Sequence, residues 1–233
     1  MFLPLLPLPL LLVAIVLLIR AETRLPRDGQ KVKLWKSLAS AAVGLVALIS
    51  FTQPTHLPLY SALVLAGLLL SLLGDWWLSE ADEQPRRFLS ALFAFLFAHL
   101  AYILAFGYAQ LARSAPFDLN RAALAAGILL LLGSVIYYYA RPSLGELRQP
   151  ALLYITVISL TVHQAVSGVQ ISGSLLAQPA LAVGSALLFY VSAFFLIINR
   201  FVFDNEGEGN SVWALSTHYG AQLLVALSAS FVR

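Results

Sequence analysis

The aspartate at position 75 is the residue whose type and position most need a chemical explanation. Asp75 lies near the end of an apolar run that begins at Leu57. A carboxylate in membrane hydrocarbon costs on the order of 2.5–3.5 kcal/mol on insertion scales, and such residues often carry function. Ser71 and Ser79 lie one helical turn to either side and share its face. This pattern indicates a buried carboxyl that transfers protons; the alternative is a side chain that reaches back to the lipid headgroups.

Other polar side chains are predicted to lie at a similar depth on neighbouring helices. The candidates for substrate contacts are, in chain order, Lys36, His99, Tyr102, Ser192, Asn199, His218, Tyr219 and Gln222. His218 and Gln222 are one helical turn apart, and so are His99 and Tyr102. Each group alone could simply hold membrane helices together. As a set they predict a polar cavity that opens to the cytoplasmic leaflet.

The sequence gives little support for a metal site or a cofactor. His99, His163 and His218 lie at different estimated depths, and neither an HxxxH nor an HxxE pair occurs. Cysteine is absent, which excludes disulfides and thiolate catalysis. We therefore expect neither a metal nor a cofactor.

The composition indicates the elements that must position these residues. Of the 233 residues, 60% are hydrophobic and only 11% are charged, whereas soluble domains carry about 25% charged residues. This predicts an all-α, polytopic membrane protein in which residues 1–233 form a single transmembrane domain. The net charge of +3 does not indicate nucleic acid as a partner, because the Lys and Arg residues lie beside apolar segments.

About eight apolar segments are long enough to span a bilayer in a single bundle. They cover residues 2–19, 34–51, 57–79, 88–109, 119–140, 150–170, 179–199 and 211–231. In the third segment, Asp75 lies about 27 Å along a hydrocarbon core of about 30 Å. That depth is about one turn from the far interface.

The distribution of Lys and Arg predicts the orientation in the membrane. Segments 20–36, 80–87, 141–149 and 200–210 hold 11 of the 14 cationic residues. Cytoplasmic loops are enriched in such residues. We therefore expect these segments in the cytoplasm and both termini outside, in the cytoplasmic membrane of a bacterium.

Four segments resemble motifs of the YhhN-type lysoplasmalogenase family. They are "LVLAGLLLSLLGD" (63–75), "FLFAHLAYILAF" (95–106), "VGSALLFYVSAFFLIINRF" (183–201) and "YGAQLLVALS" (219–228), and they occur in the order found in the family. The resemblance implies about eight membrane helices. It also implies hydrolysis of the vinyl ether of lysoplasmalogen to a fatty aldehyde and glycerophosphoethanolamine or glycerophosphocholine, with lysophospholipid and membrane lipids as partners.

The resemblance also implies two catalytic aspartates, of which this chain keeps one. The first corresponds to Asp75, and the second follows a serine in the seventh helix, where this chain has Ala193 after Ser192. The departure at Ala193 predicts impaired activity.

Three functions remain open at this stage. The first is a lysoplasmalogenase-like hydrolase, and the second is a protein that binds lysolipid without cleaving it. The third is a proton-coupled transporter in which Asp75 and His218 relay protons. Position 193 distinguishes the first two, and proton-coupled uptake would identify the third.

Overall fold

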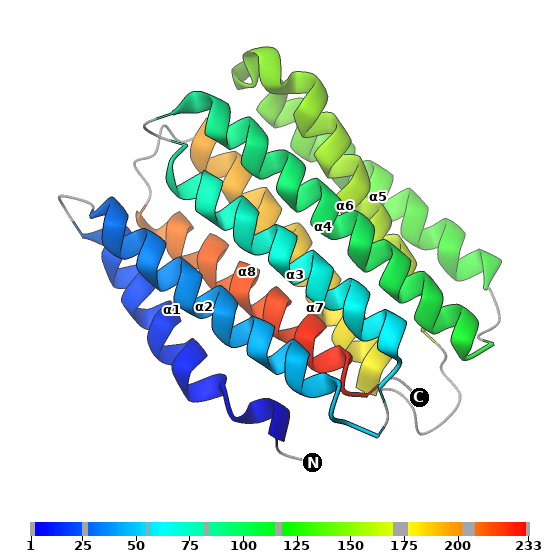
Figure 1. The fold of residues 1–233 in the computed structure, drawn as a ribbon. Coiled ribbons are helices and arrows are strands. Elements are labelled where there is room, and N and C mark those ends of the chain that lie inside the picture. The colour runs from blue at the N-terminus through cyan, green and yellow to red at the C-terminus, as the bar shows by residue number, and fades with distance from the viewer. Residues whose placement is uncertain are drawn as a thin grey trace.

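The computed structural model contains helices and no strands in the residues that it describes, which are 3–24, 28–54, 56–81, 84–114, 118–169, 177–201 and 208–231. The α-helices are α1 (Leu8–Thr23), α2 (Gly29–Ser50), α3 (Pro58–Ser79), α4 (Pro85–Ala112), α5 (Leu119–Ala140), α6 (Arg148–Ser167), α7 (Ala177–Phe201) and α8 (Glu208–Ser228). Short 3₁₀ helices occur at Leu3–Leu5, Arg141–Ser143 and Gly145–Leu147. The expected all-α bundle of eight helices is confirmed (Figure 1).

Several helices begin where the sequence offers a cap or a proline. The carboxylate of Asp28 accepts a hydrogen bond from the backbone N–H of Lys31, and Asp118 does the same for Arg121. Pro58 begins α3, and its missing N–H is not needed there, because the first N–H groups of a helix have no carbonyl partner within the helix.

Some predicted boundaries were wrong, mostly at the polar ends. The second helix begins at Gly29 rather than 34, because the cap at Asp28 allows Lys31 and Lys33 to join its first turns. The first helix runs from Leu8 to Thr23 rather than from 2 to 19. Helices α4 and α7 extend beyond the predicted 88–109 and 179–199, and α6 and α8 end before the predicted 170 and 231. Long cationic side chains can reach the interface from within a helix, so they do not mark its end.

Helix α8 differs in composition from the other seven. Within the described residues, seven helices are long and apolar enough to cross a membrane, and α8 is not among them. Its sequence places Thr217, His218 and Gln222 in the middle of the helix. These polar side chains need neighbours inside the bundle, because lipid offers no hydrogen-bond partners.

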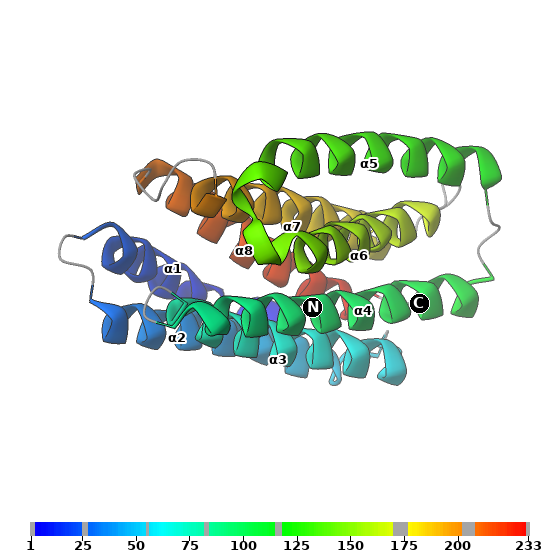
Figure 2. The same cartoon turned by 90° about the horizontal axis from the view of Figure 1, so that it is seen from above.

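The helices lie in layers that enclose α8. Helices α2, α3 and α4 form one layer, and α1, α8, α7 and α6 lie against it, with α5 outermost (Figure 2). Helix α8 packs against α7, α2, α1 and α3. Helix α5 exposes Leu124, Leu130 and Leu131, which suits contact with lipid tails.

Glycines allow α3 and α4 to approach closely. A Cβ atom on Gly74 would lie 2.8 Å from the Phe95 ring, and one on Gly67 would overlap the ring of Tyr102. Small residues at helix interfaces permit such contact in membranes. The close packing brings the aromatic side chains of α4 beside the face of α3 that carries Asp75.

Candidate functional site

Asp75 lies one turn before the end of α3, and we expect this end to face the cytoplasm. The side chain is buried inside the bundle, with 3% of its surface exposed. One carboxylate oxygen, Oδ2, lies 3.4 Å from Ser40 Oγ, 3.3 Å from His218 Nε2 and 3.4 Å from Tyr219 Oη. These partners come from α2 and α8, so Asp75 joins three helices. No hydrogen bond to the other oxygen, Oδ1, occurs among the described residues. Oδ1 is therefore the oxygen open to a ligand.

His218 is held from several sides. Its Nε2 atom lies 2.8 Å from Gln222 Nε2, one turn further along α8. The rings of Phe95 and Phe189 form T-shaped contacts with the imidazole, with centroids at 5.5 and 5.8 Å. If the Gln222 amide nitrogen donates to Nε2, the imidazole proton sits on Nδ1. If the amide presents its oxygen instead, Nε2–H can donate to Asp75.

Lys36 supports the site through both its backbone and its side chain. Its carbonyl oxygen accepts a hydrogen bond from Tyr219 Oη at 3.4 Å. Its buried ammonium group lies 3.5 Å from a carboxylate oxygen of Glu22 on α1. Lys36 therefore links α1, α2 and α8 beside Asp75.

His99 and Tyr102 form an aromatic cluster next to His218. Nδ1 of His99 lies 3.3 Å from the hydroxyl of Thr161, and the ring of His99 contacts Phe189 at 5.1 Å between centroids. The Tyr102 hydroxyl lies 3.4 Å from Ser71 Oγ. Phe189 touches the rings of both His99 and His218, so the cluster and the Asp75 site are contiguous.

The polar candidates of α7 do not reach Asp75. Ser192 donates its hydroxyl hydrogen to the carbonyl of Ala214 on α8 at 3.0 Å. Asn199 Oδ1 is buried and has no hydrogen-bond partner within the described part of the chain. Ala193 is buried one turn beyond Phe189 on the same helix. Helix α7 therefore contributes the ring of Phe189 beside His218, and Ala193 lies one turn further along the same helix.

Four residues of this region are not among the candidates named from the sequence. Ser40 bonds to Asp75, Glu22 pairs with Lys36, and Phe95 and Phe189 flank His218. Ser40 had a detectable signal, since it lies one turn from Lys36 on the same face. The two phenylalanines had none, because apolar helices contain many such rings.

The chemistry available at the site is proton transfer. An imidazole nitrogen of His218 and the phenolic hydroxyl of Tyr219 lie within 3.4 Å of the carboxylate oxygen Asp75 Oδ2. Together with aromatic faces, such groups can move a proton and stabilise a nearby positive charge. Within the described residues, no group of three or more His, Asp or Glu side chains could hold a metal ion.

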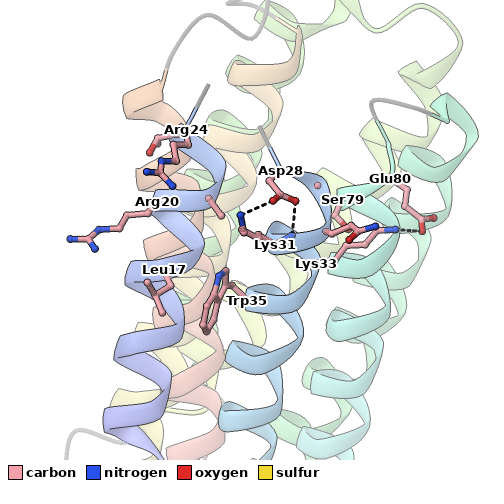
Figure 3. Close-up of a pocket in the computed structure, with 13 residues that line it drawn as sticks. Leu17, Arg20, Arg24, Asp28, Lys31, Lys33, Trp35, Ser79 and Glu80 are labelled. Carbon is pink, nitrogen blue, oxygen red and sulfur yellow. Dashed lines mark hydrogen bonds and ion pairs between the residues drawn. The ribbon is translucent and has the colours of Figure 1, made fainter. Parts of the chain in front are cut away.

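A polar groove lies close to this site, between the ends of α1, α2 and α3 (Figure 3). We call it the basic groove; its volume is about 1460 Å³. Its lining residues are Leu17, Arg20, Ala21, Thr23, Arg24, Asp28, Gly29, Gln30, Lys31, Lys33, Trp35, Ser79 and Glu80. Figure 3 shows Lys33 reaching from α2 to Glu80, with its Nζ atom 2.6 Å from Oε1.

Comparison with known proteins gives one family. A sequence model of the YhhN family matches residues 32–229. The chain is 28% identical to the Bos taurus protein named lysoplasmalogenase TMEM86A over 199 residues, which cover 84% of this chain and 73% of the relative. It is 30% identical to the Homo sapiens protein of the same name over 169 residues, which cover 71% of this chain and 64% of the relative. No solved structure matches the chain.

Proposed function

This chain belongs to the YhhN family, and we propose that it is a lysoplasmalogenase-like hydrolase. It would cleave the vinyl ether of a lysoplasmalogen and release a fatty aldehyde with glycerophosphoethanolamine or glycerophosphocholine. The observation that carries the proposal is the buried carboxylate of Asp75, which lies 3.3 Å from His218 and has one oxygen open. The names of the two relatives support the same reaction class.

The location of the site suits an amphiphilic substrate. The apolar helices and the family make this chain an integral membrane protein, so a lipid can reach the bundle from within the bilayer. The rings of Phe95, Phe189 and Tyr102 lie around His218 and His99. We expect the alkenyl chain to lie along these rings, which offer apolar contact without unpaired polar groups.

Hydrolysis of a vinyl ether begins with protonation at carbon. The carbon beyond the ether-bearing one takes the proton, and an oxocarbenium ion forms at the carbon bonded to oxygen. We assign proton delivery to the Asp75–His218 pair, which keeps the negative charge and stabilises the cation. Water then adds to the cationic carbon and gives a proton back to the pair. The hemiacetal collapses to the aldehyde and the free glycerol hydroxyl, so atoms and charge balance.

Ala193 supplies neither charge nor a proton to this reaction. Contacts between neighbouring helices indicate its depth: Phe189 touches His218, and Ser192 bonds to Ala214 one turn before His218. Position 193 therefore lies about one turn from the level of Asp75. Glycosidases use two carboxyl groups, one as the general acid and one as the nucleophile or base. This chain has one carboxyl group, that of Asp75, at the centre of the site. We expect slow hydrolysis.

The proposal is tested by incubating the purified protein with lysoplasmalogen and measuring the fatty aldehyde released. We expect Asp75→Asn to lower the release to background, because it removes the central acid with little change of shape. Asp118→Asn is the matched control, since Asp118 caps α5 away from the site and asparagine caps helices equally well. An unchanged rate in Asp75→Asn would exclude the proposed role.

Two further measurements separate the other two functions. Binding of lysoplasmalogen without aldehyde release, in the natural chain and in Ala193→Asp alike, would favour a lysolipid-binding protein. Proton-coupled uptake into vesicles that depends on Asp75 would favour a transporter.

A further inference from the structure

We propose that the basic groove binds the phosphodiester of the lysophospholipid substrate. This inference rests on the proposed function, because it takes a lysophospholipid as the ligand. The groove gives the headgroup a location between α1, α2 and α3.

The charge of the groove complements a phosphodiester. Four lining side chains are cationic, those of Arg20, Arg24, Lys31 and Lys33, and two are acidic. Lys31 pairs with Asp28 at 2.9 Å, and Lys33 pairs with Glu80 at 2.6 Å. Among the described residues, neither Arg20 nor Arg24 forms an ion pair. In Figure 3 the Arg20 side chain points away from the other lining residues, so Arg24 is the arginine whose guanidinium remains for an anion. Guanidinium matches phosphate geometry well.

The two acids suit the other half of a zwitterionic headgroup. The hydrogen bond from Lys33 is the main cause of a lowered pKa at Glu80. The hydrogen bonds from Lys31 lower the pKa of Asp28. Both carboxylates are therefore ionised at neutral pH and can attract the ammonium group of ethanolamine or choline, while Arg24 and Lys33 hold the phosphate.

The walls of the groove also fit an amphiphile. Leu17 and Trp35 line it together with the charged residues. A bound lipid can thus keep its phosphate at the cations and lay the start of its chain against apolar surface. Indole rings are common at the level of lipid headgroups for the same reason.

The groove lies at a suitable distance from Asp75. Ser79 lines the groove and follows Asp75 by one helical turn on α3. Lys33 lies about one turn before Lys36, whose carbonyl supports Tyr219. One turn is about 5.4 Å, which is comparable to the span of the glycerol that joins a vinyl ether to its phosphate. A phosphate in the groove would therefore leave the vinyl ether near Asp75 Oδ1.

The test measures binding of a lipid that the protein has no means to cleave. The probe is a saturated 1-O-alkyl lysophosphatidylcholine with a brominated chain, which quenches indole fluorescence at short range. Trp35 is made the sole reporter by changing the other three of the four tryptophans, Trp76, Trp77 and Trp213, to phenylalanine. Trp76→Phe keeps an aromatic ring beneath Lys33.

We expect the double substitution Arg24→Gln and Lys33→Gln to weaken probe binding about tenfold or more, a change equivalent to about 1.4 kcal/mol. Arg86→Gln is the matched control, because Arg86 is an exposed cation at the start of α4 that does not line the groove. Arg24→Lys with Lys33→Arg keeps the charge and should retain most of the binding, which separates loss of charge from misfolding. A brominated 1-O-alkylglycerol without phosphate should bind weakly and equally to all variants.

Three results would overturn the inference. They are equal probe binding by the double variant and the parent, equally tight binding of the phosphate-free lipid, and displacement of the probe by millimolar inorganic phosphate, which would indicate a site for the free anion. Because the saturated ether is not a substrate, these results stand even if no aldehyde release is found. Failure of the groove and failure of the proposed hydrolase are therefore distinguishable.

Discussion

At the scale of single residues, position 193 carries the main chemical question. Ala193 is buried, with 6% of its surface exposed, one turn from the level of Asp75. We expect Ala193→Asp to raise aldehyde release about 10²-fold or more, because a fixed negative charge lowers the energy of the oxocarbenium ion. Ala193→Asn is the control, because asparagine has the shape of aspartate without its negative charge. Full activity in the natural chain and no gain in Ala193→Asp would show that two carboxylates are not needed here.

His218 is the residue that would then take the second role. It lies 3.3 Å from Asp75 and is oriented by Gln222 at 2.8 Å. We expect His218→Gln to reduce aldehyde release about 100-fold or more, which is typical for loss of a positioned acid or base. His56→Gln provides the comparison, since His56 bonds to the Gln53 carbonyl outside the site. Equal rates in the two variants would leave His218 with a packing role only.

At the scale of helices, the contact between α3 and α4 determines where His218 sits. Gly74 admits the Phe95 ring, and Phe95 packs against His218. We expect Gly74→Ala to cost about 1–3 kcal/mol through overpacking and to lower activity as the ring shifts. Gly127→Ala on α5 is the control, since nothing lies within 4 Å of an added Cβ there. Thermal unfolding in detergent measures both, and an equal midpoint would mean that Phe95 moves aside freely.

The sequence predicted the helices better than it predicted their partners. Apolar runs of sufficient length define a membrane helix almost by themselves, so eight segments could be recognised, with errors mainly at ends such as Gly29. The expected contact of Asp75 with polar groups of the eighth helix is confirmed at His218 and Tyr219, because a carboxylate inside the bundle needs polar neighbours. Hydropathy does not tell which other helix faces Asp75, so the contact with Ser40 of α2 did not follow from the sequence. Ser192 illustrates the limit: its spacing suggested a cavity stripe, but its hydroxyl bonds to the backbone of α8.

At the scale of the whole molecule, polarity is arranged in the opposite way to that of a soluble protein. Leucines of α1 and α5 are exposed, while Asp75, Lys36 and Gln222 are buried near α8. Helix α8 is the helix with too many polar residues for the apolar criterion that the other seven meet, and it lies inside the bundle, where α7, α2 and α1 surround it. The site thus depends on the packing of α2, α3 and α8, because its polar groups come from these three helices.

That residues 1–233 form a single transmembrane domain stays a prediction.

The orientation in the membrane is the remaining prediction at this scale. The ends of α1 and α3 and the starts of α2, α4 and α6 lie toward the same end of the bundle (Figure 1), and that end holds Arg24, Lys31 and Arg87. By the bias of Lys and Arg, this end of the bundle should face the cytoplasm.

The orientation can be tested by labelling single cysteines. The sequence suggests Thr55 and Ser174 as external positions, but both lie outside the described residues. Because the chain has no cysteine, single cysteines give a clean signal. We expect Thr52→Cys to react with an impermeant maleimide in intact cells, and Gly29→Cys and Glu146→Cys to react only after the membrane is opened. The reverse pattern would put the basic groove on the outer face and would require lysolipid to enter from the outer leaflet.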